Sequence, residues 1–417
     1  MRPRGMIFAS ILAALLAGCA MVRTPADPGR LAQQAAASES TIAPAAIDWP
    51  IRDGDRLDQW ASVKPGPMLI FLPVFENRGR ELTEGMEVTM ASARGAVRAG
   101  RGVLIECESP PEEARGGHVY LFVSSATRAV TNWQEAWGKS MADSPNLNLP
   151  IPVNAPRVLI KPRPPQALPG KGVLVYLPPW SHWSLVEPVV REFQERGWAV
   201  AHVAVPVGFA WSDKNARRLR DSEGSIGAGA AIAAAHVDAT FAEWAYAVEA
   251  AVDQIGKTDP DAAKGPVVIL GTSAGALGAP AAAACLGERV KAAVLVGGGS
   301  NVFRIGLTGS LSDFGMGMTV DDHEPTPEQV DRLADAFAVR SRMDPGRLAA
   351  ALRQTPVLVI DAANDTIVPA RTGQDFWERL GRPERWTFPT DHELLFLRLG
   401  AYRREIADWA EAAVAPR

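Results

Sequence analysis

The regular alternation of short apolar runs with longer amphipathic segments, which begins at Arg157, constrains the fold of this 417-residue sequence more than any other feature. The runs are rich in β-branched residues (GVLVYL, WAVAHVAV, PVVIL, KAAVLV, TPVLVI), and the segments between them repeat apolar residues every three or four positions. Strands that alternate with helices predict an α/β fold, with a mostly parallel central sheet covered by helices on both faces.

Two regions depart from this alternation. About fifty residues, roughly 300–354, separate "VLVGGG" from "TPVLVID". We expect them to form an insertion after the sixth core strand, at the sheet edge where ligands bind, and to act as a lid. Between 51 and 156, strand-like runs (PMLIFLPVF, GVLIECES, HVYLFVSS) form a strand-rich region of their own or extend the same sheet.

A serine between two glycines ends one of the apolar runs, in "VVILGTSAGALGAP". At a turn from strand to helix, small residues two before and two after the serine let the strand and the helix approach each other. The serine hydroxyl then projects from the sheet. Gly271 and Gly275 occupy those two positions around Ser273. The alternative is a phosphate-binding turn, but "GTSAGALG" lacks the lysine of a P-loop. Ser273 is therefore predicted to be a nucleophile.

This turn resembles the nucleophile elbow of the α/β-hydrolase superfamily, and the resemblance extends over 157–417 through further features in the family's order. It implies the α/β-hydrolase fold and a serine hydrolase of the esterase or lipase type, which forms an acyl-enzyme and needs no cofactor. In the family, the acid and the histidine of the triad follow the serine along the chain. Only His323 and His392 follow Ser273.

Of these two histidines, the resemblance favours His392 as the base, because it follows the last strand-like run in "RWTFPTDHELLFL". His323 lies in the acidic stretch "TVDDHEPTPEQ", which is typical of a solvated surface. The stretch "TPVLVIDAANDTIVP" resembles the acid-bearing loop of the family and assigns the acid to Asp365. Asp361, at the end of the same apolar run, is the alternative acid.

The resemblance also implies an oxyanion hole made of two backbone N–H groups. One is that of Ala274, directly after the nucleophile. The second comes from the loop after "GVLVYL", where relatives carry His-Gly but this chain carries two prolines, which have no N–H to donate. The donor is then Trp180, with Ser181 next. This departure indicates either a hole shaped by proline or an impaired one.

Aromatic residues follow two successive strand-like runs, and we expect them at the edge of the sheet that carries the serine. Trp183, Phe209 and Trp211 form an apolar pocket for an acyl group, or they pack under the insertion. The expected substrate is a carboxylic ester, either a small molecule or a lipid. Two alternatives remain open: a serine peptidase with the same triad, and a non-catalytic binding lipoprotein of the same fold.

The N-terminus resembles a bacterial lipoprotein signal. Arg2 and Arg4 precede an apolar run at 6–16, which is too short to span a bilayer and is followed by Leu-Ala-Gly-Cys. The resemblance implies that a signal peptide, 1–18, is removed and that Cys19 is lipidated. An ordinary secretory signal is the alternative. Ala20, in place of aspartate, favours anchoring at the outer membrane, and residues 19–50 are expected to form a flexible tether.

The net charge is −4 and the basic residues form no run, so nucleic-acid binding is not expected. The spacing of His, Cys and Asp residues suggests no metal site, and no cofactor is expected. With Cys19 lipidated, Cys107 and Cys285 remain. Both lie in strongly apolar surroundings, so two separately buried thiols are the simpler interpretation, and a disulfide is the alternative.

Overall fold

A computed structural model describes most residues of the chain. These are 21–27, 29, 49, 55–73, 86–108, 117–124, 129–130, 151–152, 155–163, 170–180, 185–206, 218–310 and 318–415.

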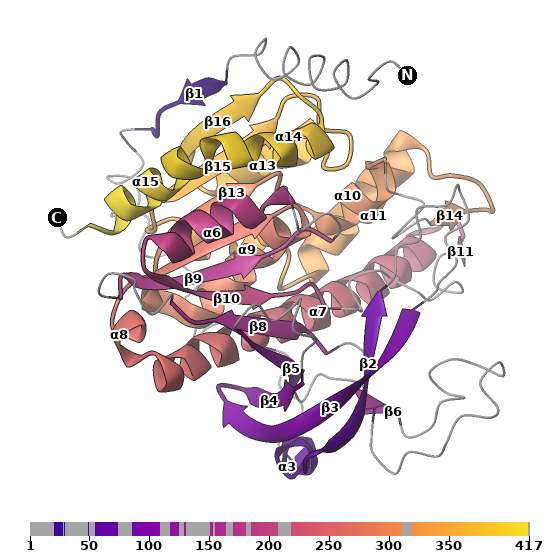
Figure 1. Cartoon of the computed structure of the whole chain (residues 1–417). Coiled ribbons are helices and arrows are strands. Elements are labelled where there is room, and N and C mark those ends of the chain that lie inside the picture. The colour runs from indigo at the N-terminus through magenta and orange to yellow at the C-terminus, as the bar shows by residue number, and fades with distance from the viewer. Residues whose placement is uncertain are drawn as a thin grey trace, which may run out of the picture.

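The centre of the molecule is a block of neighbouring parallel strands within a twelve-stranded sheet (Figure 1). Across the sheet their order is β16-β15-β13-β12-β9-β10, and each pairs in parallel with the next. Strands β9, β10, β12 and β15 are buried along their whole length, as expected for strands covered on both faces. The parallel strands are β9 (Gly172–Leu177), β10 (Trp198–Val203), β12 (Val267–Thr272), β13 (Val290–Val296), β15 (Val357–Ala362) and β16 (Glu384–Phe388).

The remaining strands of the sheet are antiparallel, so the sheet as a whole is mixed. The expected mostly parallel arrangement holds only for the central block. Beyond β10, the order continues β8-β5-β4-β3-β2, so that strands from 51–156 belong to the same sheet as the central block. A two-residue turn at Gly100 and Arg101 joins β3 to β4, and such a turn permits only antiparallel pairing. The antiparallel strands are β1 (Val22–Thr24), β2 (Gly66–Pro73), β3 (Met86–Ala99), β4 (Gly102–Cys107), β5 (His118–Ser124) and β8 (Arg157–Lys161).

Part of the expected tether is bound to the folded body at both of its ends. Residues Val22–Thr24 form strand β1, which pairs antiparallel with β16 at the far edge of the sheet. Trp49 is buried, and its ring lies 5.5 Å from that of Tyr246. The prediction of a flexible tether over 19–50 is therefore wrong for these residues. The pattern did not reveal them because β1 is short and its side chains are exposed, and because Trp49 is an isolated apolar residue.

Helices cover both faces of the central strands (Figure 1). Val173, Val175 and Leu177 of β9 belong to the core beneath α7 and α9, whereas Leu174 and Tyr176 belong to the core beneath α6, α14 and α15. Because side chains alternate between the two faces of a strand, β9 contributes residues to the cores on both faces of the sheet. The helices on the two faces are α7 (Glu223–Thr258), α9 (Ala274–Leu286) and α13 (Ala370–Arg379) on one, and α6 (Glu187–Glu195), α14 (His392–Leu399) and α15 (Arg403–Val414) on the other.

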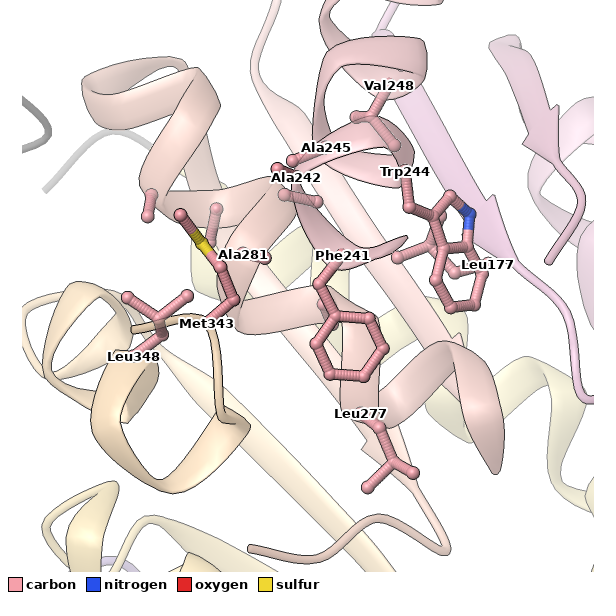
Figure 2. Close-up of a cluster of buried hydrophobic side chains, with 14 of the residues drawn as sticks. Leu177, Phe241, Ala242, Trp244, Ala245, Val248, Leu277, Ala281, Met343 and Leu348 are labelled. Atoms are coloured by element: carbon pink, nitrogen blue, oxygen red, sulfur yellow. The ribbon is translucent and has the colours of Figure 1, made fainter. Parts of the chain in front are cut away.

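The long helix α7 packs closely against α9, which follows the serine turn (Figure 2). Both helices are rich in alanine, so their backbones can approach each other. Figure 2 shows Phe241 of α7 beside Leu277 of α9, and Trp244 of α7 next to Leu177 of β9. A Cβ atom at Gly278 of α9 would lie 2.6 Å from the ring of Trp244, so a larger residue would separate the two helices. The contact between α7 and α9 therefore fixes the position of α9, the helix that begins directly after Ser273.

The insertion follows β13 and contains α10 (Val302–Thr308), β14 (Thr319–Val320), α11 (Pro327–Arg340) and α12 (Pro345–Leu348). It therefore follows the fifth strand of the large sheet counted from Arg157, not the sixth, because only five of the preceding strands pair in that sheet. Helix α11 packs along α7, and β14 pairs with β11 (Arg218–Leu219). The buried carboxylate of Asp238 on α7 accepts backbone hydrogen bonds from Arg342 and Met343, so the insertion is tied to α7.

A smaller core lies at the antiparallel end of the sheet. Trp60 of α3 (Asp55–Ala61) is buried against Val103, Ile105 and Leu121. Strands β6 (Ala129–Val130) and β7 (Ile151–Pro152) form a separate pair, and α8 (Pro260–Ala263) follows α7. Short 3-10 segments lie at Gly287–Arg289, Ala349–Leu352 and Gly400–Tyr402. Among the described residues, none of the helices is long and apolar enough to cross a membrane.

Candidate active site

Ser273 lies in the turn between β12 and α9, in a backbone conformation that non-glycine residues rarely adopt. Its φ is 52° and its ψ is −116°. The backbone N–H of Ser273 donates to the carbonyl of Val296 at 2.8 Å, and its carbonyl accepts from Ala276 and Leu277 in the first turn of α9. Strain of this kind persists only where the surroundings impose it, and it is often found at functional sites.

The two glycines around Ser273 are required by the close approach of β12, α9 and β9. A Cβ atom at Gly271 would lie 2.6 Å from the carbonyl oxygen of Gly275. A Cβ atom at Gly275 would overlap the carbonyl oxygen of Leu177, at the end of β9. The spacing seen in the sequence therefore has the physical cause expected of it. It also places the end of β9 directly beside the serine turn.

His392 is the first residue of α14, and its imidazole lies against Ser273. The distance from His392 Nε2 to Ser273 Oγ is 2.9 Å. Asp391 caps the helix by accepting from the backbone N–H of Leu394 at 2.9 Å, which fixes the helix start where the histidine lies. The imidazole is almost fully buried, and the ring of Phe396 meets it edge-on with centroids 5.0 Å apart.

Asp365 orients the imidazole from its other side. The distance from His392 Nδ1 to Asp365 Oδ2 is 2.5 Å. The second carboxylate oxygen of Asp365 accepts the backbone N–H groups of Ile367 at 2.9 Å and Val368 at 2.7 Å. In the tautomer with its proton on Nδ1, the imidazole donates to this carboxylate, and Nε2 is then free to accept the hydroxyl proton of Ser273.

Asp361, the alternative acid, makes a different contact. Its carboxylate accepts from Arg385 Nε at 2.8 Å, and none of its hydrogen bonds reaches His392. Burial raises the pKa of Asp361 to about 6, and the charge of Arg385 partly offsets that effect. Asp361, Asp365 and Arg385 also line a cavity of about 300 Å³. Of the two candidate acids, only Asp365 lies in line with the histidine and the serine.

The expected oxyanion donors lie on the two elements that meet at Ser273. Ala274 is the first residue of α9, and the first N–H groups of a helix have no partner within it. A helix N-terminus also favours negative charge. Trp180 follows β9 after two buried prolines and packs, half-buried, against the core. Ser181, Trp183, Phe209, Trp211 and Cys19 lie outside the described residues.

The other residues singled out by the sequence lie away from the serine. His323 is exposed in a tight turn, as expected of a surface residue, and donates its backbone N–H to the carbonyl of Val320. Cys107 and Cys285 are both free thiols. Burial raises the pKa of Cys107 to about 11 and that of Cys285 to about 12, which makes both poor nucleophiles. Within the described ranges, His, Cys, Asp and Glu side chains form no cluster that could hold a metal ion.

Sequence reasoning missed the role of Gly297. This glycine has a φ of +60°, and a Cβ atom there would lie 3.0 Å from His392 Cε1. A larger side chain at this position would push the imidazole away from Ser273. The run of three glycines after β13 was the signal that pointed to a close approach of this kind.

A second cavity, of about 1260 Å³, lies at the opposite edge of the sheet. It is lined by residues that begin parallel strands, including Val267, Val357 and Glu384. Ser273 follows the other end of β12, so this cavity is separated from the serine by the length of a strand. Although it is larger, it contains none of the three side chains that contact one another at the candidate site.

Comparison with known proteins yields remote structural likenesses only. The chain matches no protein-family model and no curated protein sequence. Acetyl xylan esterase 1 from Thermoanaerobacterium sp. JW/SL YS485 is similar at 14% identity, with a TM-score of 0.42 and coverage of 94% of this chain and 95% of that one. Acetyl xylan esterase from Paenibacillus sp. R4 has 14% identity, a TM-score of 0.43 and coverage of 75% and 89%.

A cold-adapted esterase from an Arctic intertidal metagenomic library has 15% identity and a TM-score of 0.38, with coverage of 72% of this chain and 95% of that one. All three TM-scores lie below 0.5. The assignment of fold and chemistry therefore depends on the strands, helices and side chains of this chain.

Proposed function

We propose that this protein is a serine hydrolase with the α/β-hydrolase fold that cleaves carboxylic esters through an acyl-enzyme. The observation that carries the proposal is the continuous chain of contacts from Asp365 through His392 to Ser273. It coincides with the strained backbone of Ser273 at a turn from strand to helix. A nucleophile, a base and an orienting acid in this geometry form the constellation of acyl-transfer enzymes.

In the reaction, His392 Nε2 accepts the hydroxyl proton of Ser273 as Oγ attacks the carbonyl carbon of the ester. Asp365 stabilises the imidazolium that forms. The imidazolium then donates its proton to the departing alcohol as the bond from carbon to the alcohol oxygen breaks, which leaves an acyl group on Ser273. A water molecule, deprotonated by the same imidazole, hydrolyses the acyl-enzyme. General-base help of this kind is typically worth about 10²–10⁴-fold in rate.

The oxyanion of each tetrahedral intermediate would be bound by the backbone N–H of Ala274 and by that of Trp180. Loss of one such donor typically slows a reaction by about 10²–10³-fold without abolishing it. A loop that carries prolines before Trp180 is therefore compatible with catalysis, even if the second donor is poorly aligned.

The catalytic proposal is tested with a fluorophosphonate probe, which forms a covalent bond to activated serines. Purified protein should be labelled, and the Ser273→Ala variant should not be, while its thermal unfolding remains close to that of the wild type. Absence of labelling in the folded wild type would contradict the proposal. A panel of soluble esters beside a panel of peptides then separates an esterase from a peptidase with the same triad.

We further propose that Cys19 carries a lipid anchor that holds the protein in the bacterial envelope, at the outer membrane, and that the insertion at about 300–354 acts as a lid. The lipoprotein-like sequence of the N-terminus supports the anchor. The lid is supported by the position of the insertion, which follows the carboxyl end of β13.

A further inference from the structure

We propose that the edge of the sheet that carries Ser273 lies at the membrane surface, and that the substrate is therefore an ester resident in that membrane. This inference rests on the proposed function, namely a serine hydrolase anchored through Cys19. It goes beyond that function because it assigns an orientation to the body and a class of substrate to the site. The observation behind it is the direction in which β1 runs along β16.

Strand β1 begins at the edge of the sheet where the candidate site lies. It runs antiparallel to β16, with Val22 opposite Thr387 and Thr24 opposite Arg385. Strand β16 ends at Phe388, and the chain continues from there to His392. The first residue of β1 is therefore level with the end of β16, from which the chain leads directly to the catalytic histidine.

Several contacts hold β1 in this position. The guanidinium of Arg23 lies 4.5 Å from the ring centre of Trp386, and Met21 packs against the core beneath α14 and α15. After the strand, the backbone N–H of Asp27 donates to the carbonyl of Arg382 at 3.1 Å. Contacts before, within and after the strand supplement the ladder hydrogen bonds, so the position of β1 does not depend on three residues alone.

The anchor cannot lie far from this edge. Cys19 precedes Val22 by three residues. An extended chain spans at most about 3.6 Å per residue, so the two Cα atoms are separated by no more than about 11 Å. Acyl chains on Cys19 must enter the hydrocarbon of the bilayer. The bilayer surface then lies within about this distance of the end of β1.

Exposed apolar side chains lie on the same part of the molecule. Helix α14, which begins at the catalytic histidine, exposes Leu394 (37%) and Leu397 (47%), and β1 exposes Val22 (61%). Singly exposed leucines are common on protein surfaces and do not by themselves indicate a partner. Here they lie on the helix that begins at His392. Because the anchor brings the bilayer to this edge, the bilayer is the partner that we infer.

A site held in this way meets esters embedded in the membrane at a far higher effective concentration than soluble esters. The natural substrate is then an acyl ester of a membrane lipid or of another amphiphile at the bilayer surface. The distance between Cys19 and β1 would determine activity on such esters, but it should not affect the hydrolysis of a soluble ester.

The experiment changes that distance in the full-length, lipidated protein. A flexible Gly-Ser segment of about twenty residues, with a mean span of roughly 25 Å, is inserted between Ala20 and Met21. The matched control carries the same segment between Gln33 and Gln34, which follow β1, so its anchor stays adjacent to the strand. Each protein is reconstituted into vesicles of phosphatidylethanolamine and phosphatidylglycerol. The vesicles also contain a lipid alcohol esterified with acyl chains from acetyl to palmitoyl, and 4-nitrophenyl acetate serves as the soluble ester.

We expect the insertion before β1 to lower hydrolysis of the embedded ester by at least roughly tenfold. The control insertion should not lower it, and hydrolysis of the soluble ester should be equal in all three proteins. Equal hydrolysis of the embedded ester by both insertion variants would overturn the inference. So would a wild type that cleaves the soluble ester but none of the embedded ones.

Failure of the proposed function would give results different from failure of this inference. A wild type that fails to float with the vesicles, as a Cys19→Ser variant should, lacks the anchor. A wild type that hydrolyses neither ester and is not labelled by the fluorophosphonate probe lacks the chemistry.

A double variant, Leu394→Gln with Leu397→Gln, tests the contact surface separately. This variant should hydrolyse the embedded ester several-fold more slowly and the soluble ester at the wild-type rate. If its rate on the embedded ester equals that of the wild type, α14 does not contact the membrane.

Discussion

The two aspartates near His392, Asp361 and Asp365, lie only four residues apart but have different hydrogen-bond partners. Asp365 shares its two oxygens between an imidazole and two backbone N–H groups. Asp361 lies at the buried end of β15, where Arg385 is the partner of its carboxylate. Under the proposed function, this difference in contacts gives Asp365 the catalytic role and Asp361 a structural one.

Matched substitutions test this assignment. Asp365→Asn should lower kcat for a soluble ester by roughly 10⁴-fold, because an amide cannot hold the imidazole in the required tautomer. Asp361→Asn should lower kcat far less, because that side chain makes none of its hydrogen bonds to His392. The measurement is kcat and KM for both variants at one pH, with thermal unfolding as the control for folding. If Asp361→Asn caused the larger loss of kcat, the acid would be misassigned.

The raised pKa of Asp361 makes a separate prediction for stability. Its carboxyl, with a pKa of about 6 in the folded protein and an ordinary value of 3.8, binds more protons in the folded state between those two values. Its contribution to stability is therefore complete below about pH 4 and is lost as the pH rises through about 6. The loss at neutral pH is about 3 kcal/mol.

Urea unfolding of the wild type and of Asp361→Asn at pH 4, 5, 6 and 7 measures this effect. The free energy of unfolding of the wild type should fall relative to that of the variant as the pH rises. Groups remote from Asp361 are the same in both proteins, so their effects largely cancel in the difference. Parallel pH profiles would show that Asp361 does not titrate in this way.

At the scale of the elements, the serine turn is where β12, α9 and β9 approach one another most closely. The Gly275→Ala variant would place a Cβ atom on the carbonyl of Leu177, so it should lower the free energy of unfolding by about 1–3 kcal/mol and also reduce fluorophosphonate labelling. Gly224→Ala is the matched control. Gly224 lies in the first turn of α7, with no atom within 4 Å of its added Cβ. That variant should be unchanged or stabilised by up to about 1 kcal/mol.

Urea unfolding measures both glycine variants. A Gly275→Ala protein as stable and as readily labelled as the Gly224→Ala protein would show that β9 and α9 can separate without cost.

Local spacing explains which features could be predicted from the sequence. Ser273 between its two glycines, Asp365 in its loop and His392 at the start of α14 are each recognised from a few neighbouring residues, and these three side chains contact one another in the structure. The alternation of strands and helices after Arg157 is equally local. By contrast, the pairing of β2 to β5 with β8 depends on contacts between distant segments, which periodicity does not specify.

At the scale of the whole molecule, the largest departure from expectation is at the N-terminus. β1 is three residues long with exposed side chains, so its sequence carries no hydrophobic pattern. Its place depends on backbone groups offered by β16 and on the ring of Trp386. Trp49 likewise depends on Tyr246 and Arg101, which are remote along the chain. The composition of residues 19–50 predicts a tether, because composition does not indicate which distant residues β1 and Trp49 contact.

The pairing of β1 with β16 also covers one edge of the large sheet. Without β1, the parallel block would end in a strand whose unpaired N–H and C=O groups are open to a second molecule. A recombinant chain trimmed to begin at Asp55 would lose that cover, and it would also lose Trp49 from the opposite part of the core. The segment next to the proposed anchor thus also protects an edge against self-association, and shortened chains should be handled as aggregation-prone.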